Sequence, residues 1–270
     1  MPNPFRLYGR FLRTYMKTQL EYRFSFFGDI FVNMMTFVTL YLSFWVLFNT
    51  FPTMNGWNYW EVVFLYNLNL LTYAISSLFF WGPMKQLEHL VRSGEFDQFL
   101  VRPLGPLKLL VFRQFQHTFI GHIIVAGTVM VLCTIQLQIH WTAGNIAFLL
   151  LCVLGGTLIQ AGIIIAAASS AFWVVRSGTV VDISIYAIRN FINYPISIYG
   201  RSIQLLLTFA IPYAFVNYYP AAAFFGKDHA GSSELSNLYS YSSLAVGAVL
   251  FAVAIWIFRR GVMRYDSAGS

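Results

Sequence analysis

The stretch that decides the fold is "NIAFLLLCVLGGTLIQAGIIIAAASSAF", residues 145–172, which contains no charged side chain. A helix of roughly 20 apolar residues crosses the hydrocarbon core of a bilayer, because each residue adds about 1.5 Å. Gly162, Ala166 and Ser170 recur at intervals of four, and small side chains at that spacing let helices approach closely in lipid. The stretch therefore predicts a transmembrane helix that packs against another helix, without indicating which one.

Composition extends this prediction to the whole chain. Of its 270 residues, 58% are hydrophobic and only 10% are charged, and the mean hydropathy is +0.63. A soluble domain cannot bury that much apolar surface. The apolar blocks are continuous and do not alternate with a period of two, which argues against a β-barrel. We expect residues 1–270 to form a single all-α, polytopic membrane domain.

The predicted crossings follow from the apolar blocks and from topology. Blocks suited to cross the bilayer lie at about 26–49, 61–80, 117–138, 145–172 and 241–258. Both ends of this set are flanked by basic residues, so the positive-inside rule places both termini in the cytoplasm and requires an even number of crossings. Although a window scan favours the segment around Pro212, we predict 179–198 as the fifth of six crossings. Residues 202–225 then form a re-entrant element at the outer face, broken at Pro212 and Pro220.

The N-terminal segment has the pattern of an interfacial helix. Basic residues recur at intervals of four, three and four along one stripe of residues 5–24: Arg6, Arg10, Arg13 and Lys17. An adjacent apolar stripe suits a helix lying in the membrane interface. The alternative is a helix packed against other cytoplasmic parts. With this topology, all of the 17 Lys and Arg residues except Arg201 and Lys227 lie in the cytoplasm, so the net charge of +7 reflects membrane orientation and does not indicate a nucleic-acid partner.

A charged loop, residues 82–114, separates the second and third predicted crossings. Within it, "LVRSGEFDQFLVRPLG" (residues 90–105) mixes acidic, basic and aromatic side chains. Orientation in the membrane explains the basic residues, but acids contribute little to orientation. Interleaved apolar and charged side chains are typical of a docking surface for another protein. Gly94 and the sequence "RPLGP" predict a short helix, a tight turn and a second short helix.

The loop also carries a family resemblance. The run "SGEFDQFLVRPLGPLKLLVFRQ" after a second crossing resembles bacterial ABC-2 type transporter permeases, in particular the subgroup with a G-E-F-D-x-x-L-V-R-P-like loop. The N-terminal amphipathic helix is similar to that family's connecting helix. The segment "YPISIYGRSIQLLLTFAIPYAFVNYYPA" and the "FRRG" exit are similar to the residues around its last helix. The resemblance covers essentially the whole chain.

The resemblance implies a half-transporter in the bacterial inner membrane. Two six-helix permeases, identical or related, would pair, and two ATP-binding subunits would dock beneath them. This chain has no G-x-x-x-x-G-K-[ST] phosphate loop, so ATP and magnesium would be bound by those partners and this chain would hold no cofactor. The positions that match the family's ATPase-coupling helix are Glu88, Arg92, Gly94, Glu95, Phe96, Asp97 and Leu100, with Arg102 and Pro103 setting the return to the membrane. Three prolines would belong to an outer gate: Pro195, Pro212 and Pro220.

Several polar residues lie inside predicted crossings. Asp182 and Arg189 are seven residues apart, so in a regular helix they share a face, and with Asn190 and Asn193 they could face the translocation path or the subunit interface. The alternative is that both lie near the inner boundary, where Arg189 can snorkel. Single amides are expected to make hydrogen bonds between helices: Asn33, Asn67, Asn69 and Gln160.

We therefore predict the permease subunit of an ATP-driven exporter that moves an amphipathic or hydrophobic substrate outward, and not an enzyme. A secondary transporter or channel is the first alternative, but inverted repeats predict a pair of discontinuous helices and only one proline-broken segment is evident. An integral-membrane lipid-modifying enzyme is the second. The five histidines and two cysteines form no metal set or catalytic pair in the sequence. The substrate is not determined at this level.

Overall fold

The computed structural model describes residues 23–174, 177–227, 239 and 241–265. The predicted connecting helix, with Arg6, Arg10, Arg13 and Lys17, lies outside the described residues except for its last positions. Regular structure in the described part is helical, and the one isolated β-bridge joins Met54 and Trp57 across a tight turn. Five helices are long: α2 (Arg23–Thr50), α3 (Tyr59–Arg92), α6 (Phe119–Gln136), α7 (Ala143–Ser169) and α13 (Ser243–Arg264).

Four of the described helices are long and apolar enough to cross a membrane: α3, α6, α13 and α7 with the short turn η1 (Ser170–Phe172) that extends it. A fifth crossing is reached if the bent pair 201–210 and 213–224 forms one span. Large apolar side chains also stand on the outside of the bundle, among them Phe31, Trp45, Ile135, Leu150 and Val249. A soluble surface does not carry so many. The chain is an all-α polytopic membrane protein, and the count of six crossings stays a prediction.

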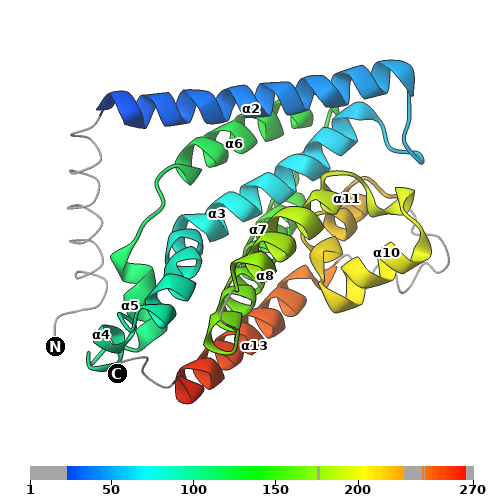
Figure 1. Cartoon of the computed structure of the whole chain (residues 1–270). Helices are drawn as coiled ribbons and strands as arrows, with labels where there is room; N and C mark the ends of the chain where they lie inside the picture. The colour runs from blue at the N-terminus through cyan, green and yellow to red at the C-terminus, as the bar shows by residue number, and fades with distance from the viewer. Residues whose placement is uncertain (1–22, 175–176, 228–238, 240, 266–270) are drawn as a thin grey trace.

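Helix α3 forms the centre of the bundle and is buried along most of its length (Figure 1). Helices α6 and α7 pack along it, and α2 crosses α3 and α6 at an angle (Figure 1). Aromatic edges join α2 to the core: the ring of Phe44 lies 5.5 Å from that of Tyr66, and Phe37 lies 4.9 Å from His122. Because α3 packs against α2, α6 and α7 as well as several shorter elements, its apolar residues face protein more than lipid.

The small-residue face of α7 packs against α13. A Cβ added to Gly155 would lie 2.6 Å from the backbone nitrogen of Leu244, and one added to Gly247 would lie 2.5 Å from the carbonyl oxygen of Gly155. Gly162 meets Leu250 in the same interface. Contacts advance along both helices together, so α7 and α13 run parallel. Backbones this close gain dispersion contacts that larger side chains would prevent.

The helical run after α7 is irregular. It consists of α8 (Gly178–Asp182), the π-helical turn η2 (Ile183–Ala187), α9 (Ile188–Asn190) and the 3₁₀ turn η3 (Phe191–Asn193). We call residues 178–193 the π-interrupted helix. It ends before the predicted boundary of 198, because Tyr194 is extended (φ −120°, ψ 159°). A residue that precedes a proline, here Pro195, is disfavoured in helical geometry.

The following segment folds back at the opposite end from α4 and α5. It contains η4 (Ile196–Ile198), α10 (Arg201–Leu205), the π turn η5 (Leu206–Ala210), η6 (Tyr213–Phe215) and α11 (Tyr218–Phe224). The chain bends by 80° between 201–210 and 213–224, at Pro212. The predicted break at Pro220 is wrong: Pro220 lies in the first turn of α11, where a missing N–H loses no intrahelical bond.

Candidate functional site

The charged loop forms a folded unit at one end of the bundle. Helix α3 continues through Pro83 to Arg92, and the N–H of Ser93 donates to the carbonyl of His89 at 2.9 Å. Gly94 then turns the chain with φ +74°, a left-handed conformation that glycine adopts without strain. Two short helices follow, α4 (Asp97–Leu100) and α5 (Pro106–Arg113), near the C-terminal end of α13 (Figure 1).

Phe96 anchors this loop to the rest of the protein. Its side chain is 0% exposed, and its ring lies 5.2 Å from both Phe172, at the end of α7, and Tyr265, just after α13. Phe99 stacks on it at 5.9 Å. The prediction that Phe96 contacts a partner subunit is therefore wrong. An apolar ring between charged residues looks like a docking contact in sequence, but here the chain's own helix ends cover it.

Glu88 also makes its contacts within the chain. Its carboxylate accepts hydrogen bonds from the hydroxyl of Ser177, at 3.1 Å, and from the backbone N–H of Gly178, and it lies 3.5 Å from the guanidinium of Arg92. A carboxylate at the beginning of a helix satisfies N–H groups that have no intrahelical partner. Glu88 thus joins the end of α3 to the start of the π-interrupted helix. Its predicted role as a direct ATPase contact stays a prediction.

The remaining predicted contact residues lie on the outside of the loop. We call the exposed set the loop surface, and it consists of Arg92, Glu95, Gln98, Leu100, Val101, Arg102 and Pro103. Gly94 and Asp97 are half-buried. Val101 is 84% exposed, the highest value among the large apolar side chains given for the described chain, and sequence reasoning missed it. The signal was available, since Leu100 and Val101 form an apolar pair between charged neighbours.

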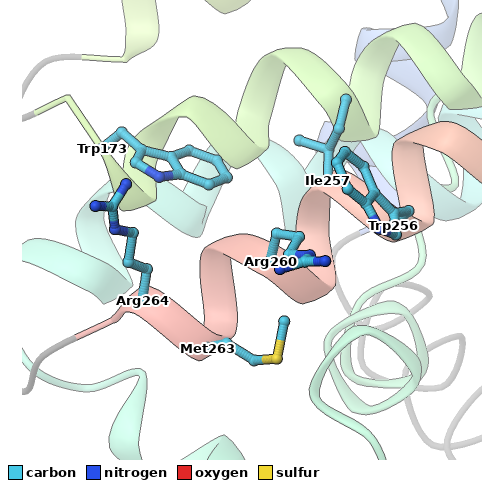
Figure 2. Close-up of a pocket in the computed structure, with 6 residues that line it drawn as sticks. All are labelled: Trp173, Trp256, Ile257, Arg260, Met263 and Arg264. Carbon is cyan, nitrogen blue, oxygen red and sulfur yellow. The ribbon is translucent and has the colours of Figure 1, made fainter.

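The same end of the molecule carries a hollow lined by aromatic and basic side chains. It measures about 760 Å³ and is lined by Trp173, Trp256, Ile257, Arg260, Met263 and Arg264. Figure 2 shows Trp173 beside Arg264, with Arg260 reaching between Trp256 and Met263. The guanidinium of Arg260 lies 5.3 Å from the centroid of the Trp256 ring. Tryptophan and arginine together are typical of the boundary between hydrocarbon and lipid headgroups.

Amide side chains connect three elements inside the bundle. Gln160 of α7 donates to Asn69 of α3 at 3.0 Å, Asn69 donates to Asn193 at 3.1 Å, and Asn193 donates to Asn190 at 3.4 Å. Asn67 accepts from the Tyr41 hydroxyl at 2.8 Å. Interhelical bonding of Asn67, Asn69 and Gln160 is therefore as expected, whereas the side chain of Asn33 lies outside the described residues. We call Gln160, Asn69, Asn193 and Asn190 the amide chain.

Replacing Asn69 with leucine tests the amide chain. We expect the unfolding free energy in detergent to fall by about 1–3 kcal/mol, because Gln160 and Asn193 keep buried amides without their partner. Adding Gln160→Leu should restore part of the loss by removing one unsatisfied group. Gln136→Leu, at an exposed position of α6 outside the amide chain, is the control and should change stability by less than about 0.5 kcal/mol. A double variant less stable than N69L would contradict this account.

The π turn separates Asp182 from Arg189. It adds about one residue to the turn, which rotates everything after it by about 100° relative to an α-helix. Asp182 is exposed, whereas the Arg189 guanidinium lies 3.7 Å from the centroid of the Tyr73 ring on α3. The predicted shared face is therefore wrong. The Arg189 side chain packs on α3, and the alternative of an arginine snorkelling to the inner boundary stays a prediction.

These features define a class: a polytopic helical membrane protein with an anchored, charged loop at one end. The described residues contain no group of three or more His, Cys, Asp or Glu that could hold a metal ion. Residues 25–269 match the family described as ABC-2 family transporter protein, and the chain belongs to that family. It is thus a membrane component of a transporter, and membership implies ATP-binding partner subunits. Searches of curated proteins and of solved structures returned no match.

Proposed function

We propose that this chain is the permease subunit of an ATP-driven exporter, and that separate ATP-binding subunits dock on the loop surface. The observation that carries the proposal is the loop itself: it is anchored from inside by Phe96 and presents charged and apolar side chains outward. The chain has no phosphate loop, so the ATPase subunits, of which we propose two, bind ATP and magnesium. A second six-helix permease, identical or related, completes the membrane unit.

The proposed location is the bacterial inner membrane with both termini in the cytoplasm. The charge distribution supports this orientation. At the end of the bundle that carries the loop surface, the basic residues are Lys85, Arg92, Arg102, Lys108, Arg113, Arg259, Arg260 and Arg264. At the opposite end of the described chain they are Arg201 and Lys227. An excess of lysine and arginine marks the cytoplasmic side.

The contacts of the loop suggest how force would reach the membrane helices. A push on the loop surface acts on Phe96, which packs against the ends of α7 and α13. It also acts on α3, whose Glu88 holds the start of the π-interrupted helix. Closure of the ATPase pair would therefore move four elements together. The 80° bend at Pro212 belongs to the segment at the far end, where Pro195, Pro212 and Pro220 would contribute to the proposed outer gate.

Charge reversal on the loop surface tests the docking. Glu95 is exposed, so Glu95→Lys should leave folding unchanged and weaken association with a co-expressed ATP-binding subunit by about tenfold. The measurement is the amount of ATPase subunit that copurifies, together with ATPase activity in proteoliposomes. Arg201→Glu reverses an exposed charge at the opposite end and is the matched control. Docking unaffected by E95K but lost in R201E would refute both the site and the orientation.

A further inference from the structure

If the π-interrupted helix is the predicted fifth crossing, Arg189 falls near the bilayer centre. It follows Gly178 by eleven residues, and at about 1.5 Å per residue this places it roughly 15 Å along the π-interrupted helix. Gly178 itself is held at the inner end by Glu88. The hydrocarbon core is about 30 Å thick, so the predicted crossing would place the guanidinium about halfway through it. Tyr73, on which it stacks, also lies near the middle of the apolar part of α3.

The surroundings of Arg189 are aromatic, and none of the described acidic side chains forms an ion pair with it. Besides Tyr73, the guanidinium is within electrostatic reach of Tyr66, Tyr213 and His122. Its Nε atom is buried and makes no hydrogen bond. The ion pairs found among the described side chains join Arg92 to Glu88 and Lys227 to Glu61. Asp182, the nearest acid in sequence along this helix, is exposed and forms no ion pair with Arg189.

An arginine at this depth raises the free energy of the folded protein. A cation inside the hydrocarbon region is strongly unfavourable unless a counter-ion or water compensates it, and one face of a tyrosine ring offsets only part of that cost. Ionisable groups retained at this depth are therefore associated with function. Lipid headgroups lie at the bilayer boundary and not at its centre. A substrate that passes through the membrane centre would bring a negative charge to this guanidinium, whereas an acid from the second permease is the alternative that the binding assay below tests.

We propose that Arg189 recognises an anionic group, such as a phosphate, sulfate or carboxylate, on the amphiphile that this permease exports. The proposal rests on the exporter function above and adds the charge class of the substrate. The rings of Tyr73 and Tyr66 supply an apolar wall beside the guanidinium, and the exposed amide of Asn190 is the next residue in the chain. A bidentate arginine favours oxyanions in particular.

Binding to the full-length chain in phosphatidylcholine nanodiscs tests this directly. The probe is radiolabelled dodecyl phosphate, corrected for uptake by empty nanodiscs, and dodecyltrimethylammonium is the competitor of matched chain length. We expect Arg189→Gln to weaken dodecyl phosphate binding by about 10- to 100-fold, the effect of a lost charge-assisted hydrogen bond. Arg189→Lys should retain part of the affinity, and Arg201→Gln should retain all of it. Competition by the ammonium compound should be weak.

Thermal unfolding separates recognition from a structural role. If Arg189 is kept for the substrate, R189Q should have an unchanged or higher melting temperature, because an unpaired cation has been removed. A lower melting temperature with unchanged dodecyl phosphate binding would overturn the proposal, as would equal binding of the anionic and cationic probes by the unaltered chain. No ATPase subunit is present in this assay. A failure of dodecyl phosphate binding therefore counts against the role of Arg189, whereas a failure of the docking experiment counts against the proposed function.

Discussion

Replacing Phe96 with alanine is expected to detach the loop from the helix ends. The side chain is fully buried among Phe99, Phe172 and Tyr265, and removing a buried phenylalanine costs about 3–5 kcal/mol. That loss falls on a short segment held by few other contacts, so the loop should open locally while the bundle stays folded. Limited trypsin digestion should then cleave after Lys108, which is exposed in the same loop, well before the membrane helices are attacked. ATPase docking should be lost in the same variant.

Val101→Ala is the matched control for this experiment. Val101 belongs to the same loop but is 84% exposed, so its truncation should change stability by less than about 0.5 kcal/mol. If V101A nevertheless weakens ATPase association, Val101 is a contact on the loop surface, whereas F96A acts through loop position. Trypsin resistance equal to that of the unaltered chain in F96A would show that Phe96 is not the anchor.

Alanine at Gly155 is expected to disrupt the interface between α7 and α13. The new methyl group would lie 2.6 Å from backbone atoms of Leu244 and Ser243, and backbone cannot rotate away as a flexible side chain can. Overpacking of this kind costs about 1–3 kcal/mol, and more where two helices must separate. We expect lower yield of monodisperse protein in detergent and a lower melting temperature. Gly247→Ala should behave in the same way, because its methyl group meets the carbonyl of Gly155.

Gly127→Ala is expected to have the opposite effect on stability from Gly155→Ala. Gly127 lies in α6, and an added Cβ there meets nothing within 4 Å. Alanine restricts the unfolded chain and favours helix, so G127A should stabilise the protein by about 0.5–1 kcal/mol. Opposite signs at the two glycines would confirm that close approach, and not helix propensity, sets the requirement at Gly155. A loss of stability in both variants would contradict it.

The sequence predicted the features that depend on local composition. The apolar stretch 145–172 corresponds to α7 with η1, and of the small residues predicted to pack closely Gly162 does so against α13. The turn after the second long helix occurs at Gly94, and the backbone there has the positive φ that only glycine adopts easily. The interhelical amides were also predictable, because a buried polar group inside a membrane needs a partner and has few to choose from.

The direction of individual side chains was not predictable. Phe96 was expected to face a partner and instead faces the chain's own helix ends. Glu88 was expected on the docking surface, and its carboxylate accepts from Gly178, which is distant in sequence. In both cases the sequence shows the kind of contact a residue can make, but the neighbour is supplied by another element that only the folded chain brings near.

The sequence by itself determined that this protein crosses a membrane as helices and that one loop gathers its charge, because the length and polarity of a segment are properties of that segment alone. The tertiary structure decided what the polar residues do. One π-helical turn at 183–187 turns Asp182 outward and leaves Arg189 over Tyr73 without an acid among the described side chains. That turn packs against α7 in the folded chain. Its π-helical hydrogen-bond pattern changes the direction in which the residues after it point around the helix axis.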